Sequence, residues 1–136
     1  MDTAIAPCGC PATLHLPLLS DGRAARQARQ AAARLLAQEA DAWPREVAED
    51  FVLIVSELVG NAVLHAAGPY VLTLSLERGR AGIAVSDGTA DLSGEHGDAR
   101  REEPGGRGLK IVRALGADLF VSPSIRGKQV IAVLTW

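Results

Sequence analysis

Apolar and polar positions change their period along the first half of the chain. Residues 12–17 alternate between apolar and polar side chains and end at a proline, a pattern typical of a short edge strand. Apolar positions then recur at helical spacing from a cap at Ser20 or Asp21 to about residue 42. Pro44 occupies a first-turn position and acidic residues follow it, which indicates a second helix that ends near residue 68. We therefore predict one strand and two helices before residue 70.

The second half of the chain predicts four strands, one short helix and one long loop. The strands are expected at 70–77, 81–86, 118–122 and 129–136, and the helix is expected at 106–116. Residues 89–105 contain three glycines and several acidic residues, with hardly any large apolar residue. Loops of this length inside compact domains are usually functional, so we expect this loop to belong to a site.

Composition limits the number of domains and the class of partner. The 136 residues, 48% of them hydrophobic, suffice for one folded domain with one core. A formal net charge of −2 gives no electrostatic reason to expect nucleic acid or an anionic membrane as a direct partner. The longest apolar runs fall far short of the roughly 20 residues that span a bilayer, and the N-terminus lacks a basic region followed by an apolar one. These features predict a cytoplasmic protein.

The first eleven residues have the character of a tail. Cys8 and Cys10 lie between two prolines, which indicates an irregular segment outside the fold. With His15 they offer three zinc ligands, whereas structural zinc sites use four ligands in recognised spacings. We expect a disordered tail over residues 1–11 with reduced thiols, and a single domain over residues 12–136.

One polar stripe interrupts the apolar second helix. Glu57, Asn61 and His65 follow one another at intervals of four residues, which stacks them along one side of a helix that is otherwise largely apolar. Burying a carboxylate and an amide without partners costs several kcal/mol, on the order of 2–7 for a neutral group alone. The stripe is therefore expected to face a cavity that holds a ligand, a metal or water. The alternative is a helix with one solvated face, although residues 47–77 contain no Lys or Arg.

Two further segments complete a possible nucleotide site. Glycines at residues 105–108 precede the short helix, where backbone N–H groups and the helix dipole favour phosphate oxygens. Asp87 and Gly88 end an apolar strand. An amide oxygen such as that of Asn61 suits Mg²⁺ held mainly by phosphates, and Glu57, one turn away, can accept a proton from an attacking hydroxyl. Together these parts describe an ATP·Mg²⁺ site, although singly the glycines are more often a loop-to-helix turn and Asp87 a turn residue.

The order and spacing of these motifs resemble the ATP-binding domain shared by DNA gyrase, heat-shock chaperones, histidine kinases and mismatch-repair ATPases. Residues 56–66, SELVGNAVLHA, and 105–112, GGRGLKIV, are more closely similar to the small bacterial anti-sigma factor serine kinases in the single-domain form of actinomycetes. The resemblance covers residues 12–136. It implies an α+β two-layer sandwich in which three helices cover one face of a mixed, mostly antiparallel sheet.

The resemblance also implies a role for each residue of the site. Asn61 would coordinate Mg²⁺, Glu57 would act as the general base, and Asp87 would receive the amino group of adenine. Residues 89–105 would form a lid over ATP. The remaining nucleotide-binding positions would be Gly88, Gly106, Arg107, Gly108 and Leu109.

The implied function is an ATP-dependent serine/threonine kinase of the anti-sigma factor type. It would phosphorylate a small anti-sigma factor antagonist and be able to sequester a sigma factor. The resemblance is also compatible with a homodimer, although no surface patch in the sequence indicates one. Two departures from the family pattern predict weakened nucleotide affinity: the order Asp87-Gly88-Thr89 in place of Asp-x-Gly, and Gln129 in place of a threonine. The alternatives are a non-catalytic ATP-responsive regulatory module and an interaction domain that binds no nucleotide.

Overall fold

The computed structural model describes residues 12–39, 43–89, 106–124 and 127–136. The expected N-terminal tail with its two cysteines, and nearly all of the expected lid, lie outside these residues. The elements in chain order are β1 (Ala12–Pro17), α1 (Ala24–Gln38), α2 (Arg45–His65), β2 (Val71–Glu77), β3 (Arg80–Asp87), α4 (Gly106–Ala114), β4 (Asp118–Ser124) and β5 (Gly127–Thr135).

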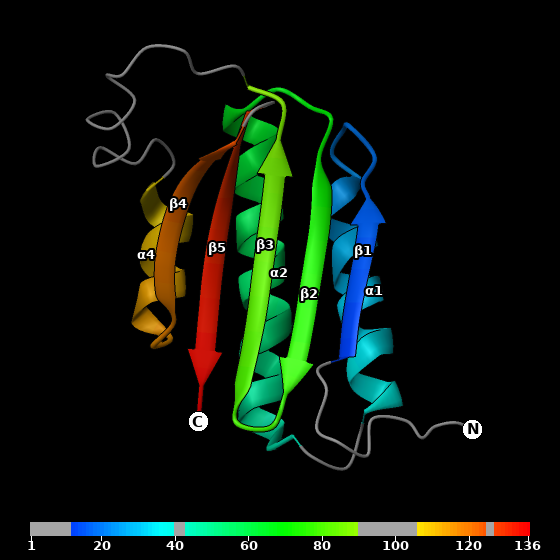
Figure 1. Cartoon of the computed structure of the whole chain (residues 1–136), viewed down its shortest axis with the longest axis vertical. Helices are drawn as coiled ribbons and strands as arrows, with labels where there is room; N and C mark the ends of the chain where they lie inside the picture. The colour runs from blue at the N-terminus through cyan, green and yellow to red at the C-terminus, as the bar shows by residue number, and fades with distance from the viewer. Residues whose placement is uncertain (1–11, 40–42, 90–105, 125–126) are drawn as a thin grey trace.

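The described strands form one sheet in the order β1-β2-β3-β5-β4, and the described helices lie together on one of its faces (Figure 1). This arrangement confirms the α+β two-layer prediction. Every pairing among the described strands is antiparallel, so the sheet is more uniform than the mixed sheet expected. The reason is that β4, which runs in the same direction as β3, lies beyond β5 and does not pair with β3.

The ends of the elements differ from the prediction in ways that local contacts explain. The first helix begins at Ala24 instead of near Asp21, because Asp21 forms a turn in which its carboxylate accepts the N–H of Arg23 at 2.8 Å. The second helix ends at His65, and the Tyr70 hydroxyl donates to the Ala66 carbonyl at 2.6 Å. The fourth strand continues through Pro123, which an edge strand tolerates because its outer N–H groups need no partner.

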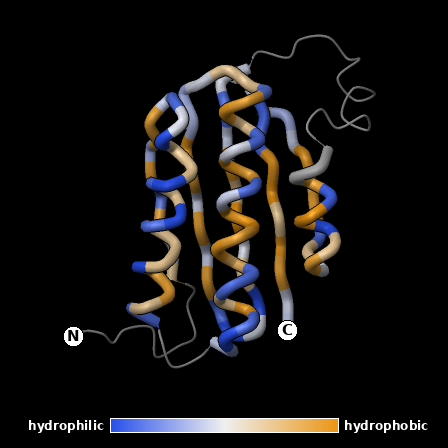
Figure 2. Tube along the Cα trace, turned by 180° about the vertical axis from the view of Figure 1, so that it is seen from behind, coloured by the Kyte–Doolittle hydropathy of each residue, from blue (hydrophilic) through white to orange (hydrophobic). Residues whose placement is uncertain are grey.

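The core lies between the sheet and the helices. The strands β2 and β3 alternate strictly between buried and partly exposed positions, so every second side chain points toward the helices. Phe51, Ile54 and Leu58 of α2 are buried against them. Figure 2, seen from the helix side, shows α2 between α1 and α4. The alternation on β3 places Asp87 on the same inner face as Val85, which carries a carboxylate to the edge of the core.

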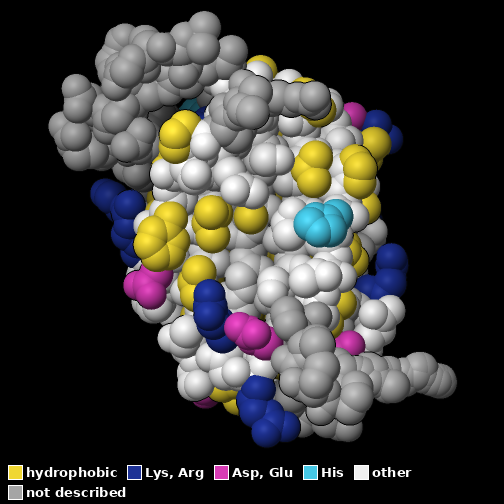
Figure 3. Space-filling view, viewed as in Figure 1, with side chains coloured by type: hydrophobic (Ala, Val, Ile, Leu, Met, Phe, Trp, Pro, Cys, Tyr) yellow, Lys and Arg dark blue, Asp and Glu magenta, His cyan; other side chains and the backbone are white. Residues whose placement is uncertain are grey.

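The outer face of the sheet carries no helix from the described residues. Figure 3 shows apolar side chains spread over this face, with most of the charged side chains nearer its edges and lower end. A hollow of about 240 Å³ lies on this face over β2, β3 and β5, and its lining includes Thr73, Arg80 and Ile131. Among the helices described, none is long and apolar enough to cross a membrane.

Candidate functional site

The polar stripe predicted on the second helix is present on α2. Glu57 and Asn61 are half-buried and His65 is exposed, while Ile54 and Leu58 beside them are buried. Within the described part of the chain, neither the Glu57 carboxylate nor the Asn61 amide has a hydrogen-bond partner. Both groups are therefore available to a ligand, and neither has been buried at the cost of an unsatisfied polar atom.

A surface groove of about 670 Å³ runs along this stripe. We call it the α2 groove. One wall is the C-terminal half of α2, and the other is the corner between β1 and α1. Its lining residues are Asp21, Gly22, Ala25, Ser56, Glu57, Gly60, Asn61, Val63, Leu64 and His65. The hollow expected beside the stripe is thus an open groove with Glu57 and Asn61 in its lining.

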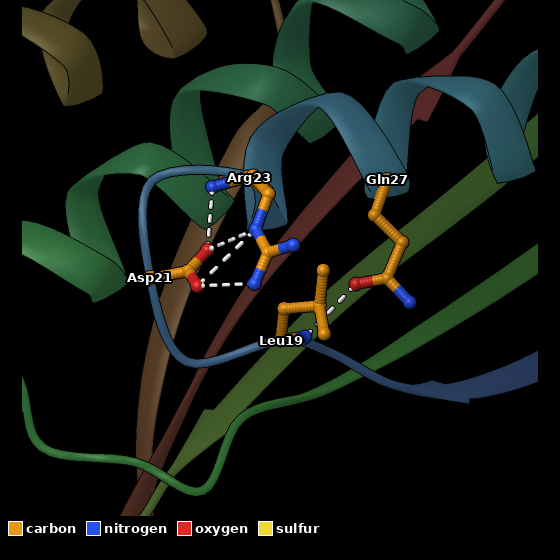
Figure 4. Close-up of polar contacts among 4 residues, drawn as sticks. All are labelled: Leu19, Asp21, Arg23 and Gln27. Atoms are coloured by element: carbon orange, nitrogen blue, oxygen red, sulfur yellow. Dashed lines mark hydrogen bonds and ion pairs between the residues drawn. The ribbon is translucent and has the colours of Figure 1, made fainter.

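The corner between β1 and α1 is held by local polar contacts (Figure 4). The Asp21 carboxylate accepts the backbone N–H of Arg23 and, at 2.8 Å, its Nη2. Hydrogen bonds from the side chain and then the backbone of Arg23 lower the pKa of Asp21 below its ordinary value. The Leu19 N–H donates to Gln27 Oε1 at 2.9 Å. These contacts fix the start of α1 and with it one wall of the α2 groove.

Asp87, predicted from its position at the end of a strand, has its carboxylate almost fully buried. Its side chain is 2% exposed, and Lys128 Nζ donates to Oδ2 at 2.8 Å. The Thr89 N–H donates to Oδ1 at 2.9 Å. Asp87 is therefore the centre of a small polar network, which the interpretation as a simple turn residue does not explain.

The end of β3 is tied directly to the end of α2. The Gly88 N–H donates to the Ala67 carbonyl at 2.8 Å, and the Ala67 N–H donates to Thr89 Oγ1 at 2.8 Å. A Cβ at Gly88 would lie 2.5 Å from the Gly68 carbonyl oxygen. Only glycine fits this contact without displacing backbone. The sequence predicted Gly88 as a nucleotide-binding position; its contacts with residues 68 and 69 also require glycine for packing.

The predicted phosphate-binding segment forms the start of α4. Gly106 begins the helix, and the first four N–H groups of a helix have no partner inside it. Those groups belong to residues 106–109. The Leu109 side chain is buried in the core, so only the backbone N–H of Leu109 is available to bind a phosphate oxygen. The side chain of Arg107 lies outside the part of the structure that is described.

The elements that carry the predicted site residues each have one end at the same end of the molecule. Figure 1 shows the C-terminal ends of α2 and β3 and the N-terminal ends of α4 and β5 at the same, upper end. Glu57 and Asn61 belong to the C-terminal half of α2, so all the predicted elements of the site approach this end. The α2 groove itself includes Glu57 and Asn61 but neither Asp87 nor Gly88.

Sequence reasoning missed two residues of this region. Lys128 and Thr89 both contact the Asp87 carboxylate, and neither contact was predicted, although Thr89 was the first residue of the expected lid. Lys128 is the cross-strand partner of Asp87 in the β3–β5 pair. In the sequence, Asp87 directly follows one predicted strand and Lys128 directly precedes another, which predicts a contact only if the two strands are known to be neighbours.

Comparison with known proteins supplies the family. A search of curated proteins found no match. The family profile described as the histidine kinase-like ATPase domain matches residues 18–134, which include nearly all of the described fold and every predicted site residue. The chain belongs to the histidine kinase-like ATPase domain family.

Proposed function

We propose that this protein is an ATP-dependent serine/threonine kinase of the anti-sigma factor type, which phosphorylates a small antagonist protein and also binds a sigma factor. The observation that carries the proposal is the pair Glu57 and Asn61, which lie one turn apart on α2 without partners among the described residues. An unpaired carboxylate and amide one turn apart beside a groove are groups that a nucleotide and its metal ion can use.

The residues present fit a nucleotide with its magnesium ion. The described residues contain no group of three or more acidic, histidine or cysteine side chains that would hold a metal by itself. Mg²⁺ needs few protein ligands when phosphates supply the others, and the Asn61 amide oxygen suits that role. When bound, Mg²⁺ would neutralise the charge on the phosphates during transfer. The N–H groups at the start of α4 would donate hydrogen bonds to phosphate oxygens. The Asp87 carboxylate would accept a hydrogen bond from the adenine amino group.

Glu57 is the residue proposed to handle the proton. As the acceptor hydroxyl oxygen bonds to the γ-phosphorus, the bond from that phosphorus to the β,γ-bridging oxygen breaks and ADP leaves. The hydroxyl proton passes to the Glu57 carboxylate. Most of the rate acceleration in such reactions comes from positioning and charge stabilisation. The open α2 groove gives a protein hydroxyl a route to Glu57.

The test replaces Glu57→Gln and follows transfer of labelled γ-phosphate to candidate antagonist proteins. We expect transfer to fall by about 10²–10⁴-fold, the usual worth of a positioned general base, while Mg·ATP still raises the melting temperature. Glu49→Gln is the matched control, because Glu49 is an exposed carboxylate on the same helix, 3.6 Å from Arg45. Full phosphate transfer by Glu57→Gln would show that Glu57 is not the base.

The same experiment separates the kinase from its alternative. A non-catalytic, ATP-responsive regulatory module would show the thermal shift with Mg·ATP and nucleotide-dependent partner binding, but no phosphorylated product with any candidate antagonist. In that case the Glu57 and Asn61 stripe would serve nucleotide binding alone.

A further inference from the structure

The carboxylate that the proposed function assigns to adenine already has a charged partner. Lys128 Nζ lies 2.8 Å from Asp87 Oδ2, and the Thr89 N–H holds Oδ1. The Asp87 side chain is 2% exposed and that of Lys128 is 25% exposed. Lys128 therefore covers the acceptor oxygen from the side that solvent reaches.

The backbone holds Lys128 in this position. Lys128 and Asp87 are directly opposite in the antiparallel β3–β5 pair, so their side chains project to the same face. At the neighbouring position, a Cβ on Gly127 would collide with the Asp87 carbonyl oxygen. Glycine thus allows the first residue of β5 to pack against the end of β3, which keeps the Lys128 side chain beside the carboxylate.

Lys128 can leave the carboxylate without disturbing this backbone. Its four-carbon stem is flexible and its ammonium group is strongly hydrated, so a partly exposed lysine can turn its head into water. Asp87, by contrast, is confined by the core beneath it and by the Thr89 N–H. Lys128 is therefore the movable member of the pair.

We infer that Lys128 is a specificity-determining residue that competes with the amino group of a purine base for Asp87; this inference rests on the proposed ATP site. A hydrogen bond from an ammonium group to a carboxylate is stronger than one from a neutral amino group. Binding of adenine must displace Lys128 from Oδ2 and exchange a charged donor for a neutral one. Lys128 thereby lowers the affinity for ATP and reduces the preference for bases that carry an amino group.

The test compares ATP with inosine triphosphate, in which a carbonyl oxygen replaces the amino group, by titration calorimetry. Lys128→Met keeps most of the stem and removes the charged donor. We expect it to bind ATP about tenfold or more tightly than the wild type, the worth of one hydrogen bond to a charged group. Inosine triphosphate should gain nothing, because its carbonyl oxygen can accept from Lys128 but is repelled by a bare carboxylate.

Two further variants serve as controls for the effect of Lys128→Met. Arg80→Met removes one cation from the opposite end of the same strand pair and should leave both affinities unchanged. Lys128→Gln keeps a neutral hydrogen-bond donor near Asp87, so it provides a second test if Lys128→Met does not fold. Its affinity for ATP should lie between that of the wild type and that of Lys128→Met.

The outcomes distinguish failure of this inference from failure of the proposed function. If the wild type binds ATP and neither Lys128 variant binds it more tightly, Lys128 does not compete for Asp87. Weaker ATP binding by the variants would mean that Lys128 itself contacts the nucleotide, which also overturns the inference. If neither the wild type nor any variant binds ATP, the proposed ATP site is absent and this inference is wrong as well.

Discussion

Gly88 offers a quantitative test of how the end of β3 is joined to the end of α2. A Cβ at this position would lie 2.5 Å from the Gly68 carbonyl oxygen and 2.9 Å from Pro69 Cδ. Ordinary contact begins at 3.4 Å, so Gly88→Ala requires backbone to move by nearly an ångström. The same movement would stretch the 2.8 Å hydrogen bond from the Gly88 N–H to the Ala67 carbonyl.

The expected loss follows from these two contacts. Overpacking a tight site costs about 1–3 kcal/mol, and a weakened backbone hydrogen bond adds about 0.5–1.5 kcal/mol. Alanine also stabilises the folded protein by about 0.4–1 kcal/mol, because it lowers the conformational entropy of the unfolded chain. We therefore expect Gly88→Ala to lower the free energy of unfolding by about 1–3.5 kcal/mol, measured by urea denaturation.

Gly82→Ala is the matched control, because it makes the same chemical change on the same strand. Its Cβ would lie 3.8 Å from Ser75 Cβ, an ordinary contact. We expect this variant to be unchanged or more stable by up to about 1 kcal/mol. If Gly88→Ala is as stable as Gly82→Ala, the close junction between α2 and β3 is wrong, and so is the placement of Asp87 beside it.

Two further predictions concern the core and the β1–α1 corner. Phe51 is fully buried, so Phe51→Ala should lower the free energy of unfolding by about 3–5 kcal/mol, whereas Leu53→Ala on the exposed side of α2 should cost about 1 kcal/mol or less in the same urea experiment. Arg23 lowers the pKa of Asp21 in the folded state, so the stabilisation it provides is present above the ordinary pKa of 3.8 and is lost as the pH falls through the lower folded value. The stability gap between the wild type and Asp21→Asn should therefore narrow below pH 3.8, and a gap that stays constant with pH would contradict this assignment.

Much of the fold follows from periods in the sequence because the elements are locally determined. The alternation of β2 and β3 and the helical spacing of α2 each depend on burial of one face, which the sequence records directly. Helix ends were less predictable. Asp21 was a plausible cap, but its carboxylate accepts the N–H of Arg23 in a turn, and α1 begins only at Ala24.

The candidate site was predictable only where its residues lie on one element. Glu57 and Asn61 are four residues apart on α2, so their spacing alone predicts that they share a side. The contact between Asp87 and Lys128 joins residues 41 positions apart. It depends on β5 being inserted between β3 and β4, an order set by packing of the whole sheet. No local pattern records that choice.

The central claim is that Asn61 belongs to a nucleotide site, and a thermal melt of the purified protein with and without Mg·ATP tests it most directly. A ligand that binds only the folded state stabilises it by about 2.7 kcal/mol at one hundred times its Kd. We predict a magnesium-dependent rise in Tm for the wild type, retained by Gln30→Ala, an exposed amide on α1, and lost by Asn61→Ala. No rise for the wild type with millimolar Mg·ATP, or an undiminished rise for Asn61→Ala, would contradict the account.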